Sequence, residues 1–399
     1  MAASDDSQFP SPKSLLFSIS AGIGGHGLNV DALEALKGAW GRGYLGEAVA
    51  FSNRQNVIPG DRIRTLWWHP ARLLKFLPKA EYGGARKHAL DAVAARRLRQ
   101  GGHDIFHSWS GDCLQSLRVA NELGIASVVE IPTWHRDKGK TKPRVTKREL
   151  REAEIGGLAG LRHRLTVTRA HTLEEYDRAD LLLVLSEKAK ETFLTAGFAE
   201  DKVFMLPRGV DVGRFRPADA PPPSFRAVFV GSVIRRKGAH HLLEAWNRLR
   251  LPGAELTLVG WMEPEVREVF ERLRPPNVRH MGFAEDVSKF FREASVHVFP
   301  SECEGSAKVT YEAAASGLPQ ITTLEAGDVV VPGKTGWVIP PNDVDALCAA
   351  LEDASRRPAD LWEMGRAARA RMENEFTWDH YRERLDRAYR TAMARRSAR

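Results

Sequence analysis

Residues 296–319, VHVFPSECEGSAKVTYEAAASGLP, decide the fold of this protein. The stretch opens with a short apolar run typical of a buried strand, passes through a turn at Gly305, and continues as a helix from near Ser306. A strand, a turn and a helix in this order form the repeating unit of parallel α/β domains. Ligands of open parallel sheets bind beyond the carboxyl ends of the strands, so this turn is where we look for chemistry.

The same alternation of β-rich and amphipathic runs extends through the rest of the chain. In the first half the predicted strands are 15–20, 47–51, 104–107, 126–131 and 181–185. After the proline-rich segment 217–223 they are 227–230, 255–259, 278–281, 296–300, 319–322 and 336–339. A chain of 399 residues exceeds what one hydrophobic core usually serves. We therefore predict two α/β domains, over 1–205 and 206–375, with an Arg-rich helix at 376–399 packing on the first.

The composition argues against a membrane-spanning or disulfide-stabilised protein. The longest uncharged aliphatic run, 181–185, is far shorter than the roughly 20 residues that a membrane helix needs. The three cysteines lie far apart and form no CxxC pair, which is typical of a reduced chain without a structural zinc site. The first apolar stretch is too short for a signal peptide. We expect a cytoplasmic protein.

The net charge of +8 lies mostly in residues 1–180. Such an excess either keeps the protein soluble or attracts an anionic partner such as a lipid phosphate or a membrane surface. The run 136–151, RDKGKTKPRVTKRELR, is either a solvated loop or a site for an anionic acceptor. Trp67 and Trp68, followed by apolar residues among Arg and Lys, fit either an interfacial patch or the core. A peripheral contact with the inner face of the membrane is one reading of these features.

A basic turn follows the predicted strand 227–230. Residues 231–238, GSVIRRKG, bring Arg235, Arg236 and Lys237 to the start of a helix. Cations and the unpaired N–H groups of a helix N-terminus suit a diphosphate. The turn is not a Walker loop, because the GxxxxGK[ST] spacing is absent. The alternative is an ordinary solvated turn.

Two glutamates flank the turn within 296–319. Glu304 comes just after the strand, and Glu312 lies on the second turn of the helix that follows. Between them Gly305, Ser306 and Ala307 have little bulk, so their backbone amides can approach a ligand closely. Apolar residues lie next to both glutamates in the sequence, which favours a ligand-binding site over a helix face that only contacts solvent.

Taken together, these segments resemble the retaining glycosyltransferase family 4, whose members have the two-domain GT-B fold. The resemblance rests on two glutamates separated by seven residues and on the EAAASGLP helix end at 312–319. Further similar pieces stand in the expected order: VLS at 184–186, LPRGVD at 206–211, RKG at 236–238, MGF at 281–283 and GKTGWV at 333–338. The resemblance implies two doubly wound Rossmann-like domains facing each other across a cleft.

The resemblance also implies roles for the residues that match. Lys237 would hold the donor diphosphate, Glu304 would face the hydroxyls of the donor sugar, and Glu312 would bind the ribose. The remaining donor-binding candidates are Gly305, Ser306, Ala307, Lys308 and Val309 for the phosphate and Met281 for the base. The family usually has Arg where this chain has Ser232, and either Arg235 or Arg236 would supply the missing charge.

The first half offers fewer candidates. The loop AGIGGHG at 21–27 contains Gly24 and Gly25 after the first strand and is either a tight turn or part of the donor site. His107 ends a strand in a segment similar to the family's DxxHxH run, and His135 lies near the position of the family's His at the reacting sugar. Together with Glu304, both are candidate catalytic residues, and each histidine has a purely structural alternative.

The resemblance implies a retaining transferase that moves a hexose-type sugar from a nucleotide diphosphate sugar to an acceptor hydroxyl, in envelope, exopolysaccharide or glycolipid synthesis. The acceptor would be a sugar or a lipid-linked sugar. We expect no cofactor and no metal, because Asp343 and Asp345 fit the first turn of a helix. The alternatives are a sugar-nucleotide epimerase of the same fold and a non-catalytic nucleotide-sugar-binding protein. No nucleic-acid module is evident.

Overall fold

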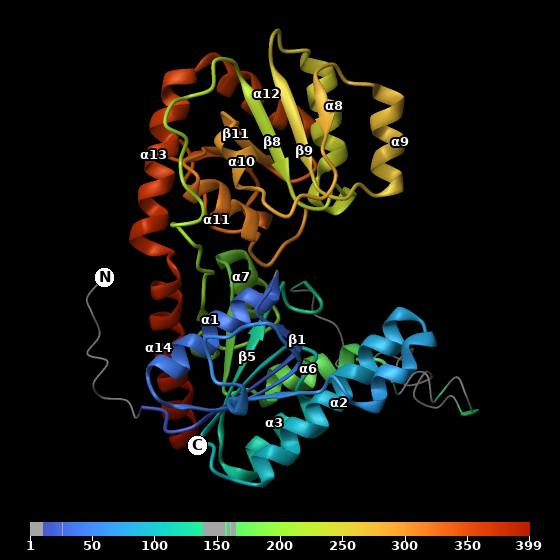
Figure 1. Cartoon of the computed structure of the whole chain (residues 1–399), viewed down its shortest axis with the longest axis vertical. Coiled ribbons are helices and arrows are strands. Elements are labelled where there is room, and N and C mark those ends of the chain that lie inside the picture. Colours follow the sequence, from blue (N-terminus) through green and yellow to red (C-terminus); the bar gives the residue numbers. More distant parts are fainter. Residues whose placement is uncertain (1–10, 26, 139–155, 158–159, 161–164) are drawn as a thin grey trace. The chain divides into compact units, whose positions relative to one another are not determined.

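The computed structural model describes residues 11–25, 27–138, 156–157, 160 and 165–399. His26 and most of the basic run 136–151 lie outside these residues. The chain divides into two compact units. Unit 1 comprises Met1–Val184, Ala189–Leu206 and Tyr381–Arg399, and unit 2 comprises Leu185–Lys188 and Pro207–His380. Both are α/β units built on parallel sheets (Figure 1).

Unit 1 contains a seven-stranded parallel sheet in the order β3-β2-β1-β4-β5-β6-β7. Its strands are β1 Leu15–Ile23, β2 Leu45–Asn53, β3 Ile63–Thr65, β4 Ile105–Trp109, β5 Ala126–Ile131, β6 Leu181–Val184 and β7 Val203–Met205. The five strands expected from the sequence all form. The sequence did not predict β3 and β7, which are three residues long and form the two edges of the sheet. The order reverses between β1 and β4, which creates a switch point.

Helices cover both faces of this sheet. They are α1 Leu28–Gly41, α2 Lys79–Arg99, α3 Leu114–Leu123, α6 Arg169–Arg178, α7 Glu187–Thr195, which begins in unit 2, and α14 Trp378–Ser397. Helices α2, α3 and α6 pack together on one face, and α1 and α14 lie together on the other (Figure 1). Tyr44 donates a 2.9 Å hydrogen bond to Asp386, and Arg382 pairs with Glu34, so α14 is an integral part of unit 1. This helix begins at Trp378 rather than at Phe376, which packs in the core of unit 2.

Unit 2 contains a six-stranded parallel sheet in the order β10-β9-β8-β11-β12-β13. Its strands are β8 Arg226–Val230, β9 Glu255–Val259, β10 Val278–His280, β11 Val296–Phe299, β12 Gln320–Thr322 and β13 Gly336–Val338. Its helices are α8 Ala239–Leu249, α9 Pro264–Leu273, α10 Ser288–Arg292, α11 Lys308–Ala315, α12 Val344–Arg356 and α13 Pro358–Glu375. Helix α8 contacts α9 and α12, whereas α11 contacts α13. All six expected strands form, and the order reverses between β8 and β11.

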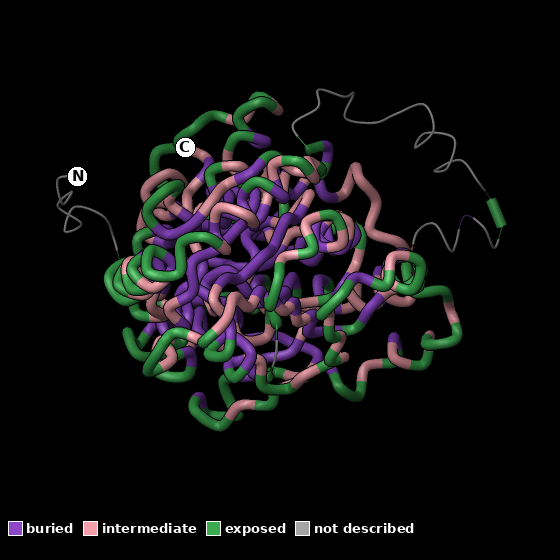
Figure 2. The backbone as a smooth tube through the Cα atoms, turned by 90° about the horizontal axis from the view of Figure 1, so that it is seen from above, coloured by how far each residue is buried: buried purple, intermediate pink, exposed green. Residues whose placement is uncertain are grey.

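The cores follow from the sequence pattern. The strands are short apolar runs, and both faces of each sheet are covered by helices, as parallel sheets require. Phe229, Phe299 and Ile321 are wholly buried in the core of unit 2, and Leu16, Phe106 and Leu182 are wholly buried in that of unit 1. Figure 2 shows such buried segments running through the interior of the trace, with exposed segments around them. Among the described helices, none combines the length and the apolar character that crossing a bilayer requires.

The close contact of Gly238 with β11 makes this glycine a sensitive point of unit 2. A Cβ added at Gly238, where φ is +69°, would lie 2.0 Å from the carbonyl oxygen of Pro300. Gly253 has nearly the same φ, +67°, but nothing lies within 4 Å of its added Cβ. We expect Gly238→Ala to lower the free energy of unfolding by more than about 3 kcal/mol and Gly253→Ala by about 1 kcal/mol. Equal effects of the two substitutions in urea unfolding would contradict this reading.

Candidate functional site

The switch point of unit 2 brings the two predicted donor-binding segments together. Strands β8 and β11 are neighbours and run in the same direction, so their carboxyl ends lie at one edge of the sheet. The basic turn 231–238 follows β8, and the turn with Glu304 follows β11. The backbone ties them, because the amide of Glu302 donates a 2.9 Å hydrogen bond to the carbonyl of Arg236.

Two cations meet one carboxylate at this edge. The Nη1 atom of Arg236 donates a 2.9 Å hydrogen bond to Oε1 of Glu304, and Nζ of Lys237 lies 3.8 Å from the same oxygen. Arg236 also donates to the carbonyl of Cys303. Burial is the main cause that lowers the pKa of Lys237, and nearby Arg236 lowers it further, whereas Glu304 raises it. Two cations facing one carboxylate leave an excess of positive charge that suits an anionic ligand.

Glycines make the close packing of this turn possible. An added Cβ on Gly231 would lie 3.1 Å from Nζ of Lys237, so the ammonium group rests against the backbone there. Gly260 at the end of β9 has φ +140°, and its added Cβ would lie 2.0 Å from the carbonyl oxygen of Gly231. Larger residues at these positions would push Lys237 or the neighbouring loop away.

The structure distinguishes the two arginines that the sequence left open. Arg235 is turned toward α9, where its guanidinium lies 4.0 Å from Glu265 and its amide donates to Glu263. Arg236 instead contacts Glu304. Ser232 is exposed beside them. Arg236 is therefore the arginine that adds charge to the candidate site.

The start of α11 is held by buried polar contacts. Ser186 donates a 2.6 Å hydrogen bond to the carbonyl of Gly305, and Arg208 donates a 3.0 Å hydrogen bond to that of Ser306. The hydroxyl of Ser306 lies 2.9 Å from that of Tyr311. The carbonyls of Gly305 and Ser306 therefore point toward these donors, and the turn is fixed before α11 begins.

One of the predicted phosphate donors is already used. The amide of Ala307 donates a 2.7 Å hydrogen bond to the carbonyl of Ala326, which corrects the expectation that it faces a phosphate. Lys308 and Val309 form the first turn of α11, and Lys308 also lies over the ring of Trp378. Glu312 is half-buried on the second turn of this helix.

Exposed apolar side chains gather beyond the carboxyl ends of β9 and β10. Met281, the predicted neighbour of the base, is 48% exposed and directly follows β10. Trp261 follows β9 with 59% of its surface exposed, and its carbonyl accepts a 2.7 Å hydrogen bond from Val233 in the basic turn. Phe283 is 80% exposed. Sequence reasoning missed Trp261, since only the fold shows that this aromatic residue lies outside the core, whereas Phe283 belongs to the segment 281–283 that the sequence had singled out.

The glycine loop of unit 1 lies at the carboxyl end of β1. Gly24 and Gly25 both have positive φ values, +76° and +110°, so this loop needs glycine at both positions. The amide of Gly24 donates a 3.0 Å hydrogen bond to the carbonyl of Asn29 in α1. The loop is thus a tight strand-to-helix turn, and its role in donor binding stays a prediction.

The structure argues against His107 as a catalytic residue. Its side chain is wholly buried on β4, on the face covered by α14. Its Nδ1 atom lies 2.8 Å from the hydroxyl of Tyr389, and its ring packs edge-on against Phe17. A side chain without exposed surface cannot contact a bound sugar in this arrangement. The pattern at 104–107 therefore marks a core histidine.

His135 is also largely enclosed. It is 5% exposed and packs against the rings of Tyr176, Phe193 and Phe198. Its Nδ1 atom accepts a 3.1 Å hydrogen bond from the amide of Asp137, so a neutral ring carries its proton on Nε2. Burial is the main cause that lowers its pKa, which favours this neutral form. Its catalytic role stays a prediction. In that role His135 would act as a neutral imidazole with its proton on Nε2.

Unit 1 has a cavity of about 270 Å³ that sequence reasoning missed. It opens where residues 111–115 follow β4, and α2 and α6 form its other walls. Charged and polar groups dominate the lining: Lys87, His88, Asp91, Asp112, Arg118, His171 and Glu175. Lys87 pairs with Asp112 at 2.8 Å, and Glu175 accepts hydrogen bonds from the amides of Gly111 and Cys113. The position beyond β4, next to the switch point of unit 1, is typical of ligand sites in such sheets.

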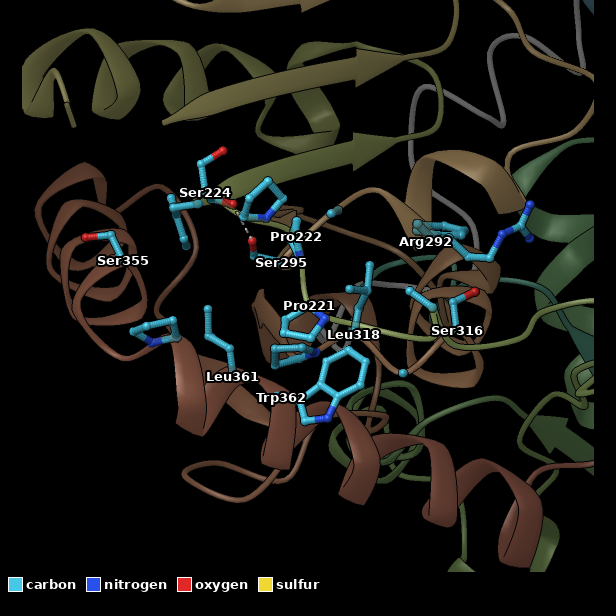
Figure 3. Close-up of a pocket in the computed structure, with 18 residues that line it drawn as sticks. Pro221, Pro222, Ser224, Arg292, Ser295, Ser316, Leu318, Ser355, Leu361 and Trp362 are labelled. Carbon is cyan, nitrogen blue, oxygen red and sulfur yellow. Dashed lines mark hydrogen bonds between the residues drawn. The ribbon is translucent and has the colours of Figure 1, made fainter. Parts of the chain in front are cut away.

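A second cavity, of about 190 Å³, lies at the opposite end of the sheet of unit 2 (Figure 3). Pro221, Pro222 and Leu318 line it together with Leu361 and Trp362 of α13. Its other lining residues include Ser224, which precedes β8, Ser295, which precedes β11, and Pro319, which precedes β12. It therefore lies at the amino ends of these strands, away from the basic turn, and is not a candidate for the donor site.

The Asp343 carboxylate has the structural role that the sequence predicted. It begins α12, and its Oδ1 atom accepts a 2.8 Å hydrogen bond from the amide of Ala346. Asp345 is exposed and pairs with Arg248. This pair of aspartates is a helix start.

Comparison with known proteins supports the resemblance of unit 2 to glycosyltransferases. Residues 224–356 match the family model of glycosyl transferases group 1. Unit 2 carries a glycosyl transferases group 1 domain. The chain is 29% identical over 246 residues to the provisionally named colanic acid biosynthesis glycosyltransferase WcaL of Salmonella typhimurium, an alignment that covers 55% of this chain and 61% of the relative. The chain thus spans less than two thirds of the relative's length.

Solved structures identify the fold of the whole chain. Sucrose-phosphate synthase of Thermosynechococcus elongatus superposes with a TM-score of 0.68 at 19% identity, over 96% of this chain and 99% of that one. HepE of Anabaena, solved in complex with UDP-glucose, gives a TM-score of 0.65 at 15% identity, over 93% and 98%. The chain has the GT-B fold, as the resemblance implied.

Glu175 in the cavity of unit 1 makes stability depend on pH. Burial raises its pKa from 4.5 to about 8. Between these values the folded state holds a proton that the unfolded state releases, so stability falls as the pH rises. We expect Glu175→Gln to remove this dependence. The free energy of unfolding of the variant, relative to that of the wild type, should rise by on the order of 3 kcal/mol from pH 5 to pH 8.

Glu174 provides the matched control in urea unfolding at the two pH values. Hydrogen bonds from Arg118 are the main cause that lowers its pKa to about 2, so it is ionised in both states over this range. The stability difference between Glu174→Gln and the wild type should therefore stay constant from pH 5 to pH 8. A constant difference for Glu175→Gln as well would contradict the raised pKa.

Proposed function

We propose that this chain is a retaining glycosyltransferase that moves a hexose-type sugar from a nucleotide diphosphate sugar to an acceptor hydroxyl, in polysaccharide or glycolipid synthesis. The observation that carries the proposal is the convergence of Arg236 and Lys237 on Glu304 at the switch point of unit 2. The match of residues 224–356 to glycosyl transferases group 1 covers this same segment. The colanic acid and capsule names of the relatives support the polysaccharide role.

The donor diphosphate needs directed positive charge in such a reaction. As the bond between the anomeric carbon and the phosphate oxygen breaks, negative charge grows on the departing diphosphate. Lys237 and Arg236 are preorganised to stabilise this charge, and the start of α11 adds its dipole. These cations take the place that a metal ion has in other transferases, so we propose that transfer proceeds without a metal.

Glu304 and Glu312 have different tasks in this proposal. Glu304 lies beside Arg236 and Lys237, the two cations proposed to bind the diphosphate. Its carboxylate would orient the sugar hydroxyls and stabilise the positive charge that develops on the sugar ring as the bond breaks. Glu312, half-buried on α11, would bind the ribose hydroxyls. The proton of the acceptor hydroxyl would pass to the departing phosphate, so the reaction needs no separate oxidant, cofactor or base. The exposed rings of Trp261 and Phe283 and the side chain of Met281 are suited to border the base.

The cavity beside β4 is our candidate for the acceptor on unit 1. Its volume of about 270 Å³ suits a sugar-sized group, and its lining offers Lys87, His88 and His171 together with buried carboxyl groups. Hydroxyl-rich ligands need many directed donors and acceptors, which this lining supplies.

Donor binding tests the proposal directly. We expect one class among UDP-, GDP-, ADP- and dTDP-sugars to raise the melting temperature of the wild type with EDTA present. Lys237→Ala should weaken this binding about tenfold or more, because it removes a charge-assisted contact to the diphosphate, and Glu312→Ala should weaken it through the ribose. Binding constants from calorimetry give the size of both effects.

Lys289→Ala is the matched control, since Lys289 is an exposed lysine of unit 2 on α10. It should bind the donor as the wild type does. Binding that is equally strong in Lys237→Ala and Lys289→Ala would place the donor elsewhere. Change of the donor sugar without any acceptor would favour an epimerase, and binding without turnover with any acceptor would favour a binding protein.

We also propose a cytoplasmic location with peripheral contact at the inner face of the membrane. The structure shows that Trp67, Trp68, Leu73 and Phe76 are 65%, 63%, 78% and 79% exposed, so they do not belong to the core. They lie on and just before the short helix Pro70–Phe76 of unit 1, among the basic residues Arg64, Arg72, Lys75 and Lys79. Large exposed apolar side chains among cations are typical of surfaces that enter the interface of an anionic bilayer.

Vesicle binding tests this contact. We expect the wild type to bind vesicles of phosphatidylglycerol and phosphatidylcholine in a co-sedimentation assay, and vesicles of phosphatidylcholine alone more weakly. The double variant Trp67→Ser/Trp68→Ser should bind about tenfold more weakly, because it removes two apolar anchors. Leu123→Ser, which changes an exposed apolar residue of α3, should bind as the wild type does. Equal binding of both variants would contradict a membrane role for this patch.

A further inference from the structure

The first turn of α8 and the turn after β11 bring together three side chains that bind metals in other proteins. One ligand atom each of His240, His241 and Glu302 lie within 4.8 Å of one another. The two histidines are adjacent in the sequence, but Glu302 is far away in the chain. The amide of Glu302 is hydrogen-bonded to the carbonyl of Arg236, which holds its side chain near the start of α8. The sequence led us to expect no metal site, because it did not show this convergence.

Each imidazole has a buried nitrogen that makes no hydrogen bond. His240 is 4% exposed, and its Nδ1 atom is buried without a hydrogen-bond partner. The Nδ1 atom of His241 is buried and unpartnered in the same way, while its Nε2 atom lies 3.2 Å from the amide oxygen of Asn342. A histidine that donates one ring N–H to a protein oxygen presents the lone pair of its other nitrogen, as metal-bound histidines usually do.

A buried nitrogen without a partner is costly unless something binds it. A divalent cation would contact both Nδ1 atoms at once and would also use the carboxylate of Glu302.

We propose that His240, His241 and Glu302 bind a divalent first-row transition metal, with Zn²⁺ as the preferred ion. Two imidazoles and one carboxylate suit Zn²⁺, whereas Mg²⁺ and Ca²⁺ require mainly oxygen ligands. Zinc–ligand distances are about 2.0 to 2.2 Å, so the ligand atoms of one tetrahedral ion lie about 3.4 Å apart, and the three atoms here would move closer together on binding. The bound ion would join the start of α8 to the turn after β11. This site adjoins the Arg236–Glu304 cluster but shares no side chain with it, and its test measures metal binding and does not depend on the proposed transfer reaction.

Metal binding is measured on the untagged full chain. We expect one Zn²⁺ per chain after dialysis, by elemental analysis, and a rise in melting temperature on adding ZnCl₂ but not MgCl₂. Co²⁺ in its place should show the visible absorption of a four-coordinate ion. His241→Asn and Glu302→Gln change partly exposed residues and should fold, and each should weaken Zn²⁺ binding by about tenfold to a hundredfold.

Two control variants separate this site from scattered surface binding. His280→Asn and Glu271→Gln change a histidine and a glutamate of unit 2 outside the group, and they should bind Zn²⁺ as the wild type does. Unchanged melting temperatures without metal would show that the variants fold. The proposal is overturned if the wild type retains no Zn²⁺, or if His241→Asn and Glu302→Gln bind it as tightly as the controls.

Discussion

Arg236 and Lys237 share the carboxylate of Glu304, and this contact joins the turns that follow β8 and β11. Two basic side chains in one turn repel each other, so they need a nearby anion or water. Glu304 supplies one negative charge, and in our proposal the donor diphosphate supplies the rest. The arrangement depends on β8 and β11 being parallel neighbours, because only then do the turns that follow them meet. Glycines at 231, 238 and 260 remove the side chains that would hold these turns apart.

Unit 1 uses its histidines differently. His107 and His135 are enclosed among aromatic rings, and each makes a fixed hydrogen bond through Nδ1. Burial lowers the pKa of His135, as expected for a ring that has lost most of its water. The polar groups of this unit lie instead around the cavity beside β4, where Glu175 is buried and its pKa is raised. The same loss of water therefore keeps both an imidazole and a carboxyl group neutral.

The surface divides into regions with different chemistry. Trp67, Trp68, Leu73 and Phe76 expose apolar area to water on unit 1, and Trp261, Met281 and Phe283 do so beyond β9 and β10 of unit 2. Exposed aromatic groups of this size are unfavourable in water unless a ligand or a surface covers them. Each unit therefore has its own exposed apolar surface, which we propose contacts a bilayer in unit 1 and a nucleotide base in unit 2. The group of His240, His241 and Glu302 adds a site of a third kind.

The sequence by itself determined the class of fold, the main strands and the two segments of the candidate donor site. This was possible because those features are local: a strand is a short apolar run, and the basic turn and the Glu304–Glu312 stretch are each continuous in the chain. The burial of His107, the use of the Ala307 amide and the choice of Arg236 over Arg235 were decided only by the tertiary structure. So were the exposure of Trp67 and Trp68, the cavity beside β4 and the approach of Glu302 to His240. Each of these depends on which distant segment packs against a residue, and the order of strands in the sheets sets that packing.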